Sequence, residues 1–244
     1  MAVLDIPITF IYSLPVDYYR ASSCITALTT SVMGIYMILK GRNNDPAKRF
    51  GIFCFTVAGW AFMHLIWLGM PEHPLTDTLI RLAKISVLFI PVTFLHFVVS
   101  FIGARGLSRY VRWNYLISAL FALSIWTPWH ILHGGPFLVF PYWPLAGPIF
   151  HLTVVHFFLL TIWALSLLAK AMIRESGNRQ KQLQLIFWGT LIGYVAGSID
   201  YLPWYRIPIP PFTILFVSVY IASTAYAILK HRLMDIEVVI RRGL

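Results

Sequence analysis

Seven apolar stretches, separated by short segments rich in charge or in proline and glycine, divide this chain of 244 residues. Each has about 20 residues, which as a helix is long enough to cross the hydrocarbon core of a bilayer. Lipid offers the backbone no hydrogen-bond partner, so such spans form helices rather than open sheets. The predicted spans are residues 21–40, 50–70, 80–103, 113–132, 149–171, 183–203 and 210–229. We therefore predict an all-α membrane protein built as a bundle of seven transmembrane helices.

The composition also indicates lipid as the solvent. Hydrophobic residues make up 59% of the chain and charged residues 11%, with a mean hydropathy of +0.75, whereas soluble domains carry about 25% charge. Residues 1–20 do not resemble a signal peptide, because no basic residue precedes Arg20 and two prolines interrupt the apolar run. We predict an outer tail over 1–20, a transmembrane domain over 21–229 and a cytoplasmic segment over 230–244.

The net charge of +10 is explained by where the basic residues lie. Most of the 19 lysines and arginines fall on one side of the predicted bundle, and such a bias marks the cytoplasmic side. That side holds Lys40, Arg42, Lys48, Arg49, Arg105, Arg109, Arg112, Lys170, Arg174, Arg179, Lys181, Lys230, Arg232, Arg241 and Arg242. The N-terminus is therefore predicted outside and the C-terminus inside. We expect no nucleic-acid partner.

Asp200 is the one acidic residue well inside a predicted span, and intramembrane charges are usually functional. Gly189, Gly193 and Gly197 precede it at intervals of four, a pattern that lets helix backbones approach closely. Asp200 shares their helix face, which predicts that it points into the bundle. Three roles are open for it: a buried pair between helices, contact with a ligand, or exposure at the aqueous boundary.

Lys84, near the outer end of the third span, is the partner we predict for Asp200, with Arg206 as a competitor. Pro91 lies on the same stripe as Lys84 and is expected to kink the helix beneath it. The alternative for Lys84 is to extend its ammonium to the outer headgroups, which requires no partner.

The chain has eight histidines, several of them within or at the ends of spans. His64, His130, His151 and His156 fall in the outer half and His96 lies deeper. Imidazoles can bind haem or a transition metal, but these show no ligand spacing. We favour neutral, hydrogen-bonded histidines and expect neither a cofactor nor a metal.

The outer loop "HGGPFLVFPYWPLAGP" is rich in proline and aromatic residues and has no formal charge. Its aromatic residues would suit the membrane interface, or the loop could cover the helix ends as a lid. A lid would close a mostly apolar cavity with a few polar groups, the usual form of a small-molecule site. The predicted lining is Trp67, Lys84, Trp126, His130, His156, Asp200 and Trp204.

The usual catalytic motifs are missing from the sequence: it has no P-loop, no G-x-S-x-G and no H-E-x-x-H. The last span has no mid-span lysine that could form a retinal Schiff base, because Lys230 lies at its inner end. A small-solute transporter and a haem- or cofactor-binding membrane protein are the alternatives to a receptor.

The end of the chain continues the last span with Leu229, Leu233, Ile236 and Ile240, spaced four, three and four residues apart. This is the apolar seam of a coiled coil. The alternative is an amphipathic helix on the inner leaflet, with its basic residues near anionic lipid.

Four segments resemble a known family: "FIPVTFLHFVVSFIG", "GSIDYLP", "IPIPPF" and "YAILKHRLMDIEVVIRRGL". In this order they are similar to the N-terminal seven-transmembrane sensor region of bacterial histidine kinases. The resemblance implies a multi-pass inner-membrane protein that forms a homodimer and controls a cytoplasmic kinase module in cis, with a response regulator downstream. The chain carries no phosphoacceptor helix and no ATP-binding domain, so we expect it to be the input part of a longer protein; a separate subunit acting on a partner is the alternative.

These expectations combine into one hypothesis. A small apolar or amphipathic ligand, of unknown identity, enters the outer half of a lipid-embedded bundle and favours one arrangement of the sixth and seventh helices. The change passes through Leu229, Leu233, Ile236 and Ile240 to the kinase.

Overall fold

The computed structural model describes residues 13–41 and 44–242, and within these ranges the side chains of all residues except Lys40 and residues 229–242. Its elements follow the chain in this order: α2 (Val16–Lys40), α3 (Asp45–Trp67), α4 (Pro74–Phe101), the short 3₁₀ helix η1 (Arg105–Leu107), α5 (Ser108–Ser124), β1 (Ile131–Phe137), β2 (Phe140–Ala146), α6 (Pro148–Arg174), α7 (Gly177–Ser198), the 3₁₀ helix η2 (Ile199–Tyr205) and α8 (Ile214–Arg242).

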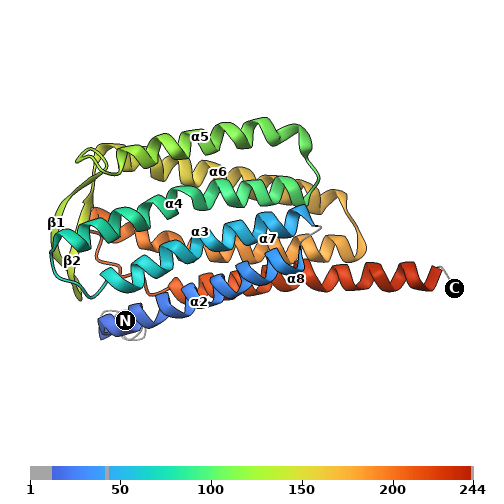
Figure 1. The fold of residues 1–244 in the computed structure, drawn as a ribbon, viewed down its shortest axis with the longest axis horizontal. Helices are drawn as coiled ribbons and strands as arrows, with labels where there is room; N and C mark the ends of the chain where they lie inside the picture. Colours follow the sequence, from blue (N-terminus) through green and yellow to red (C-terminus); the bar gives the residue numbers. More distant parts are fainter. Residues whose placement is uncertain (1–12, 42–43, 243–244) are drawn as a thin grey trace, which may run out of the picture.

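Six of the helices form a closed ring. Contacts connect α2 to α3, α3 to α4, α4 to α6, α6 to α7, α7 to α8, and α8 back to α2. The remaining helix, α5, lies outside the ring against α4, with a smaller contact to α6 (Figure 1). Only Val111 and Ser118 of α5 are buried. The ring therefore encloses the space in which a site can form, and α5 flanks it.

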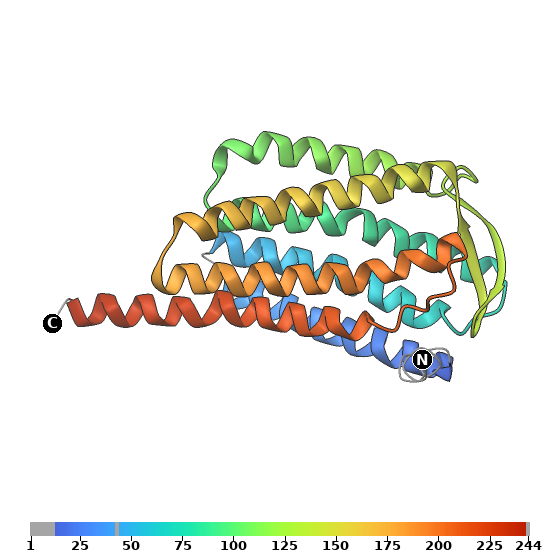
Figure 2. The ribbon, with the colours of Figure 1, turned by 180° about the vertical axis from the view of Figure 1, so that it is seen from behind.

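Five helices are long and apolar enough to cross a membrane: α2, α3, α4, α6 and α7 together with η2. The apolar part of α8, Ile214–Ile228, is shorter, and α5 has 17 residues. All the helices run roughly along one axis, and α8 continues beyond the bundle at the end opposite the hairpin (Figure 2). The arrangement fits the predicted bundle, while the number of spans stays a prediction.

Helix boundaries differ from the predicted spans at several places. Prolines at the first turns of α3, α4 and α6 begin these helices, because proline has no N–H to lose there. The helix α2 begins at Val16, inside the predicted tail. The predicted span 113–132 is wrong at its end, since α5 stops at Ser124 and turns bonded from Thr127 to Ser124 and from His130 to Thr127 follow.

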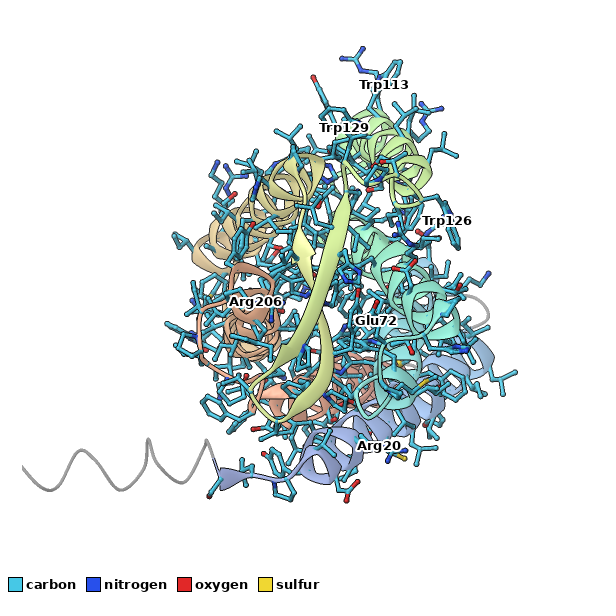
Figure 3. The ribbon with its side chains drawn as sticks, turned by 90° about the vertical axis from the view of Figure 1, so that its left-hand side faces the viewer. Arg20, Glu72, Trp113, Trp126, Trp129 and Arg206 are labelled. Atoms are coloured by element: carbon cyan, nitrogen blue, oxygen red, sulfur yellow. The ribbon has the colours of Figure 1, made fainter. Side chains whose placement is uncertain are left out.

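The segment after these turns also corrects the all-α prediction, because β1 and β2 form an antiparallel hairpin. Its prolines, Pro136, Pro141 and Pro144, are tolerated because each strand of a two-stranded ribbon has a free edge. The hairpin lies diagonally across one end of the bundle (Figure 3). This end, called the hairpin end below, also holds the start of α2 (Figure 1).

Candidate functional site

The hairpin closes the bundle with two buried aromatic side chains. Phe140 and Trp143 are almost fully buried, and their rings lie 4.8 Å apart. Phe140 packs on Tyr19 of α2 at 5.1 Å, and Trp143 packs on Trp67 of α3 at 5.0 Å. A side chain at Gly134 would collide with the Trp143 carbonyl, so glycine permits the strands to meet there. The loop therefore covers the helix ends, which is one of the two arrangements that the sequence left open.

Under this cover lies a chain of three polar side chains from three elements: Ser23 of α2, His64 of α3 and Asp200 of η2. Ser23 Oγ lies 3.0 Å from His64 Nδ1 and 2.9 Å from the Tyr19 carbonyl. Its one hydroxyl proton can be donated to either acceptor, so Ser23 donates to or accepts from Nδ1 according to the tautomer of His64. On the other side of the ring, His64 Nε2 lies 3.2 Å from Asp200 Oδ1, close enough for an ion pair although not aligned as a hydrogen bond.

The tautomer of His64 decides how the ring faces Asp200. When Ser23 donates to Nδ1, the Nε2–H of a neutral imidazole faces the carboxylate. When Nδ1–H faces Ser23, a lone pair on Nε2 would repel a carboxylate oxygen, so the pair is favourable only with a second proton. Asp200 interacts electrostatically with both His64 and Lys84.

Lys84 of α4 is buried, with 5% of its surface exposed. Its ammonium lies over three aromatic rings, at 4.1 Å from the centroid of Trp204, 4.7 Å from Phe150 and 4.8 Å from Tyr201. Among the described residues it has no hydrogen-bond partner and no carboxylate within 4.0 Å. Asp200 interacts with it electrostatically from farther away. The lysine thus turns inward, and its charge is held by aromatic faces.

A central cavity of about 60 Å³ lies inside the helix ring. Its walls come from α3, α4, α6, α7, η2 and α8 and are almost entirely apolar or aromatic. Asp200 is the one formally charged residue among them. The lining is Phe53, Val57, Trp60, Val87, Ile90, Phe157, Gly193, Tyr194, Gly197, Asp200, Tyr201, Val217 and Tyr220.

A smaller cavity of about 10 Å³ adjoins the central one, with Val87, Phe157 and Tyr201 lining both. It is the polar part of the site. Lys84, His130, Thr153 and His156 are the polar residues among its lining. The two cavities together therefore combine an apolar chamber with a polar end.

His130 lies in the turn before the hairpin, outside the membrane-spanning helices. Its Nδ1 is 2.8 Å from Ser124 Oγ, which also lies 2.7 Å from the Phe121 carbonyl. The tautomer of His130 decides which of the two side chains donates, and its buried Nε2 has no described partner. Burial, with the nearby charges of Lys84 and Arg81, lowers the pKa of His130 from 6.5 to about 4. The ring is neutral at physiological pH.

The seven residues predicted for ligand binding are distributed as follows. Lys84, His130 and His156 line the smaller cavity and Asp200 lines the central one. Trp204, which is buried, stacks on Phe150 at 4.7 Å, and the buried Trp67 lies 5.3 Å from His64. Trp126 is 55% exposed and points away from the bundle (Figure 3). The structure thus brings six of the seven together at the hairpin end, and Trp126 stands apart.

The predicted ion pairs of Asp200 are replaced by another arrangement. His64 occupies the position next to the carboxylate that was expected for Lys84. Arg206 lies over the Phe137 ring at 4.9 Å and bonds the carbonyls of Pro136 and Trp143 in the hairpin. Arg206 therefore binds the hairpin that covers the helix ends and not the Asp200 carboxylate.

The three glycines of α7 face α8. A side chain at Gly189 would lie 3.1 Å from Ser223 Oγ, and one at Gly193 would lie 2.6 Å from the Tyr220 ring. At Gly197 the nearest atom, on Val217, would be 3.7 Å away. Close packing of α7 on α8 therefore depends most on Gly193.

Sequence reasoning did not identify His64, Ser23 and the cavity aromatics Trp60, Tyr194 and Tyr220 as parts of one site. A signal was present in α3, where Trp60, His64 and Trp67 recur at the spacing of one helix face. The side chains of Leu229, Leu233, Ile236 and Ile240 lie outside the described residues, although the helix α8 itself runs to Arg242. Within the described part of the chain, no group of three histidine, cysteine or acidic side chains is arranged to hold a metal ion.

Comparisons with known proteins give one result. A family model described as the N-terminal 7TM region of histidine kinase matches residues 22–237. No curated protein matches the chain. No solved structure matches it either. The family match covers nearly the whole helical bundle and most of α8, and with the apolar helices it identifies a multi-pass membrane protein.

Proposed function

Because the chain belongs to the family of N-terminal seven-transmembrane regions of histidine kinases, we propose that it is a sensory input domain that binds a small apolar or amphipathic ligand in the outer half of its bundle. Binding rearranges the last helices and changes the activity of a cytoplasmic kinase. The hairpin end is the outer face in this proposal, and the end from which α8 projects is cytoplasmic.

The observation that carries the proposal is the contact between the central cavity and α8. Val217 and Tyr220 of α8 form part of the cavity wall, beside Gly193 and Gly197 of α7. A ligand in this space would touch the last helix directly, at the surface where α7 and α8 pack. Its effect on α8 would need no relay through other elements.

The course of α8 also supports the proposal. The helix is continuous from Ile214 to Arg242 and extends past the other helices (Figure 1). A shift or rotation at Val217 would therefore be carried along one rigid element to the segment containing Leu233 and Ile236. In a homodimer, this segment of two chains would pair as a coiled coil that leads into the kinase module.

The proposed partners follow from this role. The domain works in a bacterial inner membrane, in contact with lipid, as a homodimer joined to a kinase whose phosphoryl group passes to a response regulator. The ligand changes the output only by its difference in affinity for the two arrangements of α7 and α8.

Filling the cavity from α8 tests the proposal. Residues 1–244 are fused to a histidine kinase core, and autophosphorylation is measured in membranes. Val217→Trp introduces bulk at a position that is 7% exposed, whereas Val219→Trp introduces it on the same helix at a position that is 62% exposed. We expect the first variant to lock kinase activity in one state and the second to match wild type. Equal activity of all three proteins would refute the proposal.

A further inference from the structure

The buried ammonium of Lys84 is the feature of the site that most constrains the chemistry of a ligand. The ammonium is buried and has no hydrogen-bond partner among the described residues. Asp200, which acts on Lys84 electrostatically, forms no ion pair with it within 4.0 Å and has His64 at 3.2 Å. A buried ammonium without an acceptor for its hydrogen bonds is costly, and three aromatic faces replace only part of the stabilisation that hydration would give it. The site therefore favours an incoming anion.

The space beside Lys84 limits the kind of anion. The smaller cavity has polar groups from three elements, with Thr153 and His156 on α6 and His130 before the hairpin. It lies next to the central cavity, and Val87, Phe157 and Tyr201 line both. The central cavity has no cation among its lining residues to bind a second anionic group. A ligand with one charged head group and one apolar tail matches a polar cavity next to an apolar one.

From this arrangement we infer that the ligand is an amphipathic carboxylate, with its head group on Lys84 in the smaller cavity and its apolar chain in the central cavity. The inference rests on the proposed ligand-sensing function and states which chemical class is sensed. The carboxylate accepts hydrogen bonds from the Lys84 ammonium, and the chain lies against Phe53, Trp60 and Tyr220. Through Tyr220 the tail touches α8.

The neutral His130 adds a second polar atom at the head group. Its Nε2 is buried without a described hydrogen-bond partner. A hydroxyl on the ligand close to the carboxylate would satisfy Nε2 in either tautomer, because a hydroxyl can both donate and accept. Hydroxylated carboxylates are therefore expected to bind more tightly than plain ones.

The test uses a photoreactive decanoate carrying a diazirine near its chain end, with the protein in nanodiscs of phosphatidylcholine. Cross-linked residues are identified by mass spectrometry, and competitors are compared at equal membrane-bound concentration. Decanoate is expected to prevent labelling of α3 and α8 around Trp60 and Tyr220, whereas decanol and decyltrimethylammonium are not. Lys84→Met should weaken labelling by about tenfold or more, because it removes one partner of a buried charge pair.

Arg81→Gln is the matched control, since Arg81 lies one turn away on α4 and is already paired with Asp77 at 2.7 Å. It should label like wild type. If Lys84→Met fails to fold, the selectivity of the wild-type protein for decanoate over decanol still decides the question. Nanodiscs containing phosphatidylglycerol form a further arm, in which lost labelling would identify an anionic lipid as the occupant of the same Lys84 site.

Two results would overturn the inference, and they differ in what they mean for the proposed function. Equal competition by decanol, with labelling retained in Lys84→Met, would reject the anionic head group and leave a ligand-binding cavity in place. If neither a charged nor a neutral probe labels the cavity, both the carboxylate ligand and the cavity as a binding site are rejected. Kinase control through α8 is tested separately and needs no ligand.

Discussion

His64 Nε2 lies 3.2 Å from Asp200 Oδ1 across the interior of the bundle, and this contact joins α3 to the 3₁₀ helix between α7 and α8. Both side chains are buried. The pair connects η2, which lies between α7 and α8 in the chain, to α3, and Asp200 also lines the central cavity. It therefore lies where a small change in geometry would alter the packing of the last two helices.

Replacing either member of this pair should destabilise the protein strongly. His64→Leu or Asp200→Leu leaves a buried group without its partner, which costs about 3–5 kcal/mol. The double variant should lose clearly less than the sum of the two, because a well-packed apolar pair has no unmatched charge. Thermal unfolding of the four proteins in detergent gives the coupling between the residues.

The exposed pair formed by Arg20 and Asp17 on α2, at 3.5 Å, is the control for this cycle. Asp17→Asn should leave the unfolding temperature almost unchanged, since exposed ion pairs contribute little. Additive effects of the two buried substitutions would show that His64 and Asp200 do not act as a pair.

Gly193 and Gly197 offer a second comparison, at the interface of α7 with α8. Gly193→Ala forces a methyl group to within 2.6 Å of Tyr220, near its backbone end where the side chain cannot move aside. We expect a loss of about 1–3 kcal/mol and altered kinase activity in the fusion protein. Gly197→Ala meets its nearest neighbour at 3.7 Å and should be tolerated. Similar behaviour of the two variants would contradict the close packing at Gly193.

The stability of the hairpin end should depend on pH through His130. Its folded pKa of about 4 lies below the unfolded value of 6.5, so the unfolded chain binds more protons between these values. The stabilisation is fully present above about pH 6.5 and is lost as the pH falls toward 4, by up to about 3 kcal/mol. His130→Gln, which does not titrate, should flatten this part of the unfolding curve. An unchanged slope in that variant would assign the pH dependence to other groups.

Much of the bundle is predictable from the sequence because its signals are local. Apolar length gives the helices, and Gly189, Gly193 and Gly197 mark the face of α7 that packs on α8. The inward position of Asp200 follows from its place on that face. Burial of Lys84 follows less directly, since both an inward and an outward course were compatible with its position on α4.

The parts of the fold and the site that the sequence does not predict depend on how segments far apart in the chain pack together. No spacing rule connects His64 to Asp200 or Ser23, which come from separate helices. Trp126 was assigned to the cavity because the fourth span was expected to continue to residue 132, but α5 ends at Ser124 and lies outside the ring. The hairpin was not foreseen because proline is rare in strands and is tolerated only at the free edges of a ribbon.

The most direct test of the central claim, that α8 carries the signal, is to change the helical phase of α8 beyond the bundle. In the kinase fusion, one alanine or seven residues are inserted after Leu233. One residue turns the downstream helix by about 100°, whereas seven residues restore its phase to within about 20°. We predict that the single insertion abolishes the dependence of autophosphorylation on Val217→Trp and that the seven-residue insertion preserves it. Identical kinase activity in both insertion proteins, with the effect of Val217→Trp intact in each, would contradict signal transmission through α8.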